Sequence, residues 1–171
     1  VEGWAIVVAI LAFLFSRYTR TMARDGYLQF LGLVYGAVAA LDFVHTLAYR
    51  GMGVFDLTSG NAAAQLWVAA RWLEALGLLL APWLSRRRWH GHGTVALLAG
   101  YVTAVTVLIL HTDLFPDCFI EGTGLTLFKI GSELVICLVL MAAVAGLFWN
   151  RKAIGGPATA LLVTSVLLTI A

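Results

Sequence analysis

The sequence predicts an all-α, polytopic transmembrane helical bundle of about six helices, and two observations support this class. The 171-residue chain is 61% hydrophobic and 12% charged, with a mean hydropathy of +0.93, whereas soluble domains carry about 25% charged residues. Its apolar runs are long and do not alternate, and a backbone in lipid must satisfy its own hydrogen bonds, so helices are favoured over a barrel. We interpret residues 1–171 as one membrane domain.

The first three apolar runs cover residues 1–16, 26–49 and 62–84. The first is shorter than the roughly 20 residues that cross a bilayer, and we expect it to be truncated at the start of a fragment. The second and third are long enough to span the bilayer. Each is followed closely by an arginine, Arg50 and Arg86 respectively, which marks where the apolar run ends.

The last three apolar runs cover residues 94–111, 124–149 and 158–171. The first two of these are near or above the spanning length. Gly155 and Pro157 break the chain before the last run. We expect this last run to be truncated as well, because we interpret the chain as a piece of a larger protein.

Basic residues in the connections between these runs predict the orientation in the membrane. The first, third and fifth connections hold eight of them, whereas the second and fourth together hold one, Arg50. Basic connections remain on the cytoplasmic side, so residue 1 is expected on the periplasmic side of a bacterial inner membrane. The eight residues are Arg17, Arg20, Arg24, Arg86, Arg87, Arg88, Arg151 and Lys152.

Several polar side chains interrupt the apolar runs, and with this orientation all of them fall in the outer half of the bilayer. A charge in the middle of a lipid-facing helix costs about 2.5–3.5 kcal/mol on insertion scales. Grouping on one side therefore predicts an outward-facing polar pocket for a small ligand, an ion or a proton. The residues expected to line it are Glu2, Asp42, His45, Gln65, Arg71, Glu74, Lys129 and Glu133.

Two other interpretations of these residues remain open. In a purely structural one, Arg71–Glu74 and Lys129–Glu133 form local ion pairs that lock the bundle, because they are three and four residues apart. In the other, the chain is a redox protein that binds a transition metal or haem, since histidine with carboxylates suits Zn, Cu, Ni or Fe. The candidate metal ligands are His45, Asp42, Glu74, Glu133, His111 and Cys118, with His45 and His111 as the candidate haem pair.

The longest outer connection, residues 111–124, contains a proline and apolar side chains among its polar ones. We expect it either to fold back as a lid over the pocket or to rest on lipid headgroups. No disulfide is expected, because Cys118 lies in this connection and Cys137 in the middle of a helical run.

Composition and motifs disfavour several classes of protein. The net charge of +2 is too small to indicate a nucleic-acid partner. The sequence contains no phosphate-binding glycine loop, no GxSxG and no HExxH motif, so enzymatic activity is not expected in this chain. A transporter fragment is a further alternative, but the inner halves of the runs are aliphatic and show no broken helices in corresponding positions.

Three separated blocks resemble the third MASE family of bacterial membrane-associated sensor domains: LDFVHTLAYRGMGVF (41–55), NAAAQLWVAARWLEALGLLLAP (61–82) and FPDCFIEGTGLTLFKIGSEL (115–134). The resemblance implies an input domain fused to a cytoplasmic PAS, histidine kinase or diguanylate cyclase part, and signalling proteins of this kind usually act as homodimers. The positions that carry the family motifs are Asp42, His45, Tyr49, Asn61, Gln65, Trp67, Arg71, Glu74, Pro116, Cys118, Glu121, Gly124, Lys129 and Glu133.

Overall fold

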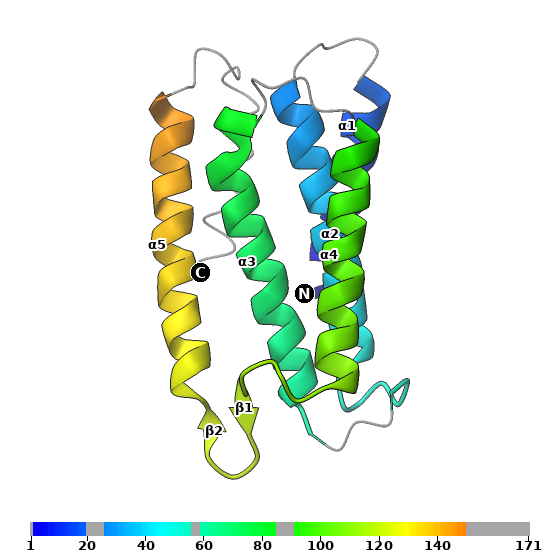
Figure 1. Cartoon of the computed structure of the whole chain (residues 1–171), viewed down its shortest axis with the longest axis vertical. Coiled ribbons are helices and arrows are strands. Elements are labelled where there is room, and N and C mark those ends of the chain that lie inside the picture. Colours follow the sequence, from blue (N-terminus) through cyan, green and yellow to red (C-terminus); the bar gives the residue numbers. More distant parts are fainter. Residues whose placement is uncertain (1, 20–25, 56–58, 85–90, 150–171) are drawn as a thin grey trace.

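The computed structural model describes residues 2–19, 26–55, 59–84 and 91–149, and this part of the chain folds into five helices and one short hairpin (Figure 1). Four of the helices, α2 to α5, are long and apolar enough to cross a membrane. The predicted class is therefore confirmed, while the sixth run, 158–171, lies outside the described residues. The elements are α1 (Glu2–Thr19), α2 (Gly26–Leu47), α3 (Asn61–Leu84), α4 (Gly91–His111), β1 (Phe119–Ile120), β2 (Gly124–Leu125) and α5 (Leu127–Trp149).

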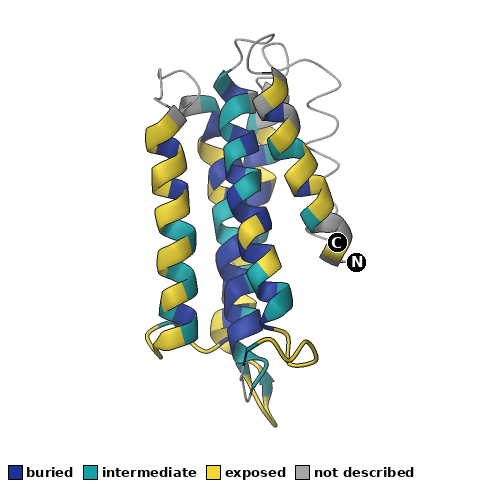
Figure 2. Cartoon of the chain, turned by 90° about the vertical axis from the view of Figure 1, so that its right-hand side faces the viewer, coloured by how far each residue is buried: buried dark blue, intermediate teal, exposed yellow. Residues whose placement is uncertain are grey.

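The helices lie along the long axis of the molecule, and α2 and α3 form its centre. Helix α1 packs on α2, α5 packs on α3, and α4 contacts both central helices. Buried residues accordingly concentrate on the central helices, whereas much of the peripheral surface is exposed (Figure 2). The α2–α3 connection and the hairpin lie at the same end of the bundle (Figure 1). The basic-residue argument predicts that this end faces outwards, and we call it the outer end.

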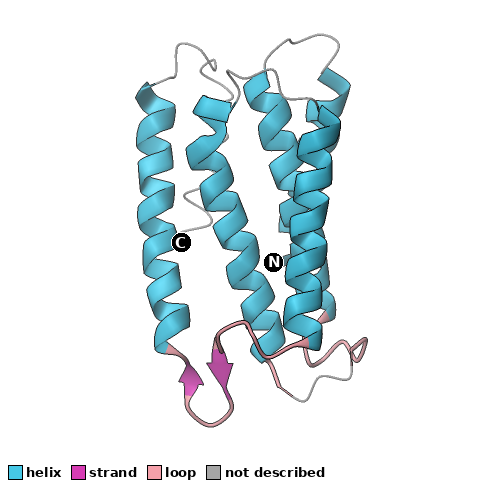
Figure 3. Cartoon of the chain, viewed as in Figure 1, coloured by secondary structure: helices cyan, strands magenta, loops and turns pink. Residues whose placement is uncertain are grey.

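The start of α5 differs from the sequence prediction. The fifth run was expected to be helical from residue 124, but residues 124–125 form β2, which pairs antiparallel with β1 (Figure 3). Gly122 and Gly124 both have φ of +90°, a backbone conformation that glycine adopts without steric cost. The error arose because hydropathy alone does not separate a short apolar hairpin from the first turn of an apolar helix.

Small residues set the spacing of the central helices. A Cβ atom added at Gly32 on α2 would lie 2.1 Å from Cβ of Ser16 on α1. A Cβ atom added at Gly77 on α3 would lie 2.5 Å from Cγ1 of Val34 on α2. These backbones therefore approach more closely than any larger residue permits, as is common between membrane helices. Close packing of α1, α2 and α3 then fixes the positions of the polar side chains that α2 and α3 carry.

Candidate functional site

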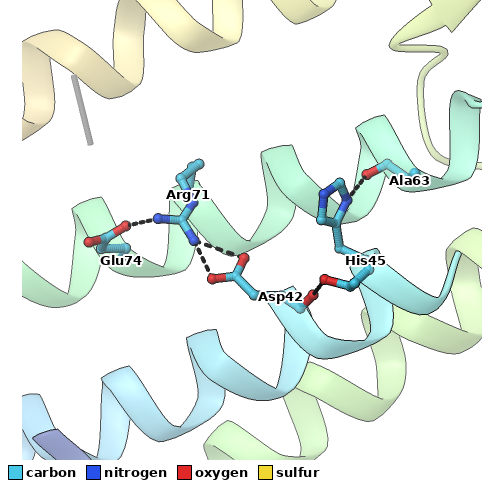
Figure 4. Close-up of polar contacts among 6 residues, drawn as sticks. Asp42, His45, Ala63, Arg71 and Glu74 are labelled. Carbon is cyan, nitrogen blue, oxygen red and sulfur yellow. Dashed lines mark hydrogen bonds and ion pairs between the residues drawn. The ribbon is translucent and has the colours of Figure 1, made fainter. Parts of the chain in front are cut away.

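A buried network of three charged side chains joins α2 to α3. The guanidinium of Arg71 donates from Nη2 to Oδ1 and Oδ2 of Asp42, at 2.8 and 2.6 Å, and from Nη1 to Oε2 of Glu74, at 2.5 Å. Arg71 thus lies between the two carboxylates, one on each helix (Figure 4). The side chains of Arg71, Asp42 and Glu74 are only 12%, 11% and 3% exposed. Because charge-assisted bonds are stronger where water is excluded, this network is a strong polar contact between the central helices.

The sequence brings these residues together through helical periodicity. Arg71 and Glu74 are three residues apart and share one face of α3. Asp42 lies 29 residues before Arg71, on the neighbouring helix. At 1.5 Å per residue, Arg71 lies about 15 Å and Glu74 about 20 Å along α3 from its first residue, Asn61. The network is therefore well inside the membrane-spanning part of the bundle.

His45 lies one turn from Asp42 towards the outer end of α2. Its Nδ1 is 2.7 Å from the backbone oxygen of Ala63, in the first turn of α3, and the ring is buried (Figure 4). A carbonyl oxygen only accepts hydrogen bonds, so Nδ1 carries the hydrogen. This hydrogen bond of His45 thus links the outer end of α2 to the start of α3.

Lys129 and Glu133 form a second polar group on α5. Nζ of Lys129 is 2.5 Å from Oε1 of Glu133 and 4.1 Å from the centroid of the Trp67 ring on α3. This cation–π contact joins α5 to α3. Trp67, Arg71 and Glu74 occur at intervals of four and three residues, so both polar groups lie along one face of α3.

The predicted cluster is therefore divided into two groups, and both local pairs of the structural interpretation are present. Among the described residues, no ion pair connects the α2–α3 network with Lys129–Glu133. Five of the charged residues predicted to line the pocket form ion pairs with each other in these two groups. Glu2 is the first residue of α1, but its side chain lies outside the description.

The connection between α4 and α5 folds back onto α3. Nε2 of Gln65 donates to the backbone oxygens of Phe115 and Pro116, both at 3.0 Å. Oδ1 of Asn61 accepts from the backbone nitrogens of Cys118 and Phe119, at 2.8 and 3.0 Å. We call residues 115–119 the cap. The amide side chains of Asn61 and Gln65, one turn apart on α3, therefore provide hydrogen-bond partners for much of the backbone of the cap.

The cap leads directly into α5. Oγ1 of Thr126 donates to the backbone oxygen of Asp117 at 2.6 Å and accepts from the backbone nitrogen of Lys129 at 3.3 Å. Thr126 is thus the N-cap of α5 and is itself tied to the cap. Two sets of contacts therefore join the outer end of α3 to α5: one runs through the cap, and the other is the contact between Trp67 and Lys129.

Cys118 is fully buried beneath this connection. Burial raises the pKa of its thiol to about 11, with the carboxylates of Asp117 and Glu133 adding to the rise and Lys129 opposing it. His111, by contrast, is exposed at the end of α4. Within the described ranges, no three His, Cys, Asp or Glu side chains lie close enough together to hold a metal ion. The geometry thus gives the metal interpretation no support.

Comparison with protein families bears directly on this arrangement. The family model of the membrane-associated sensor domain MASE3 matches residues 1–171. This chain belongs to the MASE3 family. The resemblance inferred from the three sequence blocks is thereby confirmed. No curated protein and no solved structure matches the chain.

Several residues that position the site in this MASE3 domain were not among the expected ligand-binding residues. Asn61, Trp67 and Thr126 make the contacts that hold the cap and α5 on α3. Arg50 also joins the α2–α3 connection to the hairpin through Glu121, at 2.7 Å and in an exposed position. A signal was available for Asn61, because a polar residue directly before an apolar run is typical of a helix start. The partners across the connection could not be read from spacing.

The MASE3 match and the four apolar helices establish a multi-pass membrane sensor domain. In such a protein, the Asp42–Arg71–Glu74 network is held between helices rather than placed against lipid, whereas the side chain of Glu133 on α5 is 36% exposed. Below the network, the core between α2, α3 and α5 is apolar and includes Ala75, Leu78, Ile136 and Leu140. The charged side chains of the described spans are therefore concentrated towards one end of the bundle.

Proposed function

We propose that this MASE3 domain is the sensory input module of a signalling protein of the bacterial inner membrane, with residue 1 on the periplasmic side. It detects a small ligand, an ion or a proton at the polar face shared by α2, α3 and α5. It passes the signal to a fused cytoplasmic histidine kinase or diguanylate cyclase, acts as a homodimer, and itself catalyses no reaction.

One observation carries this proposal: a single guanidinium is shared between carboxylates of two helices inside the membrane-spanning region. Any change in charge at the Asp42–Arg71–Glu74 network alters the strength of the contact between α2 and α3. A stimulus shifts a conformational equilibrium only by its differential affinity for the two states. A shared ion pair supplies such a difference, because protonating or binding one carboxylate changes what Arg71 contacts.

The connections to α5 provide a route from this network to the inner side. Helix α5 packs on α3 and follows the cap along the chain. Lys129 on α5 touches Trp67, which lies one turn from Arg71 on α3. A displacement of α3 relative to α2 therefore moves the surface of α3 against which α5 packs. The inner end of α5 leads to the basic fifth connection, which we expect in the cytoplasm.

Signalling by the full-length protein in cells tests the proposal. Asp42→Asn keeps the shape of the side chain but removes the charge that joins α2 to α3, and we expect it to change basal output, or the response to stimulus, at least fivefold. Kinase autophosphorylation or the cyclic-di-GMP level reports the output. Arg50→Gln is the matched control, because it removes an exposed ion pair on the same side of the domain. Equal, wild-type output in both variants at equal protein levels would exclude the network as the sensing element.

A further inference from the structure

Large apolar side chains are exposed on and beside both connections at the outer end of the bundle. Leu114, which follows α4, is 77% exposed, and Leu127, the first residue of α5, is 88% exposed. Leu125 on β2 is exposed as well, and so are two residues of the α2–α3 connection. Contact of such side chains with water is unfavourable. We call the following five residues the apolar rim: Tyr49, Met52, Leu114, Leu125 and Leu127.

The apolar rim lies close to the ends of the candidate membrane spans. The span on α5 begins at Leu127 itself, and the span on α4 ends at His111. At no more than about 3.6 Å per residue, Leu125 and Leu114 lie within about 7 and 11 Å of these ends. The headgroup layer on each side of the roughly 30 Å hydrocarbon core is about 5–8 Å thick. The rim is therefore within reach of the headgroup layer.

The distribution of the rim favours lipid over a protein partner. Leu114 follows α4 and Leu127 begins α5, and these two helices lie on opposite sides of α3 (Figure 1). Lipid surrounds a helical bundle, whereas a protein partner covers one face of it. The exposed apolar surface also continues from Leu127 along the span of α5, where Ile130, Leu134 and Leu138 are exposed at intervals of four residues.

The polar groups beside the rim are of the kinds found at a membrane interface. Arg50 and Glu121 form an exposed ion pair of 2.7 Å between the two connections. Tyr49, next to Arg50, lies two residues after the span on α2 ends at Leu47. Tyrosine is enriched at the level of the headgroups, and arginine extends its charge towards water from an apolar stem. These residues can therefore share one depth with the apolar rim.

We propose that the apolar rim is seated in the headgroup region of the leaflet at this end of the bundle, so that lipid is a binding partner of the hairpin. Strand β2 leads through Thr126 into α5, and Thr126 also donates to the backbone oxygen of Asp117 in the cap. Asn61 on α3 binds the backbone of the same cap. The cap is thus attached to α3 directly and to lipid through the hairpin. This surface lies outside the charged network, and the proposal does not depend on the sensory function.

Spin labels on the chain in nanodiscs of phosphatidylethanolamine and phosphatidylglycerol test the proposal. Each variant carries one introduced cysteine in a Cys137→Ala background, and a sample without an introduced cysteine measures any labelling of the buried Cys118. Oxygen concentrates in lipid, whereas a charge-neutral nickel chelate stays in water. The ratio of their collision rates with the nitroxide therefore reports how deeply each position lies.

We expect this ratio to be at least threefold higher for Leu125→Cys and Leu114→Cys than for the matched controls Thr123→Cys and Asp113→Cys. The controls are exposed positions two residues and one residue away from the rim positions. All four substitutions are at exposed sites and remove no buried side chain, so each variant should elute from size-exclusion chromatography like the wild type. Leu127→Cys gives a third rim position.

Two results would overturn the proposal. Equal ratios at the rim and control positions would mean that the rim faces water. Rim labels shielded from both oxygen and the nickel chelate would mean that protein covers the rim instead of lipid, and dipolar coupling between labels on different chains would identify a second copy as that protein.

Discussion

Replacing Arg71 by methionine removes the cation that joins α2 to α3 while keeping a long, flexible side chain. The substitution deletes three hydrogen bonds, two to Asp42 and one to Glu74. It also leaves two carboxylates, 11% and 3% exposed, without the guanidinium that they share. The loss of stability should therefore exceed the worth of the bonds themselves, because buried carboxylates that lose their shared cation are less well compensated for their desolvation.

The expected magnitude follows from burial. Removing one partner of a buried ion pair costs about 3–5 kcal/mol, whereas neutral hydrogen bonds between membrane helices average about 0.6 kcal/mol. Protonation of a stranded carboxylate relieves part of the penalty. We therefore expect Arg71→Met to lower the free energy of unfolding by about 3 kcal/mol, which is roughly a hundredfold change in the folding equilibrium constant.

Unfolding of the purified domain in mixed detergent micelles, titrated with denaturing detergent, measures this loss. Arg50→Met is the matched control, because its ion pair with Glu121 is 66% and 52% exposed and exposed pairs are worth about 0.2–1 kcal/mol. Adding Asp42→Asn to Arg71→Met removes one of the stranded charges. The double variant should regain at least about 1 kcal/mol relative to the sum of the two single variants.

Two outcomes would refute this reasoning. A loss in Arg71→Met no larger than that in Arg50→Met would mean that the network contributes no more than an exposed pair. Strict additivity of Arg71→Met and Asp42→Asn would mean that the two side chains do not interact, despite the 2.6 Å between Nη2 of Arg71 and Oδ2 of Asp42.

Two further predictions concern packing and the cap. Gly77→Ala places a Cβ atom 2.5 Å from a side-chain carbon of α2 and should lower the free energy of unfolding by about 1–3 kcal/mol. In the control variant Gly100→Ala the new Cβ atom meets nothing within 4 Å, so this change should be neutral or stabilising by up to about 1 kcal/mol. Equal melting temperatures of the two variants would contradict the packing argument. At pH 8, a thiol with a pKa of about 11 is ionised to the order of 0.1%, so Cys118 should react with iodoacetamide about 100-fold more slowly than an ordinary exposed thiol. Asn61→Ala, which removes two hydrogen bonds to the cap, should speed that reaction, and an unchanged rate would show that the cap does not protect the thiol.

Residues close in the chain were predicted more successfully than residues that meet across helices. The pairs Arg71–Glu74 and Lys129–Glu133 could be read from spacing, because three or four residues bring side chains to one helix face. The contact of Arg71 with Asp42 could not, because its partner is 29 residues away on another helix. Nor could spacing predict that the amide of Gln65, a residue expected to line the pocket, donates to backbone oxygens of the cap.

The sequence by itself determined that this chain is a membrane helical bundle and which polar residues its spans contain, because hydropathy and length are properties of single segments. The tertiary structure decided which of these residues share a partner. Close packing at Gly32 and Gly77 sets the distances between α1, α2 and α3, and these distances place Arg71 within reach of Asp42. The cap and the hairpin were likewise decided by contacts with Asn61 and Gln65, which depend on the folded position of α3.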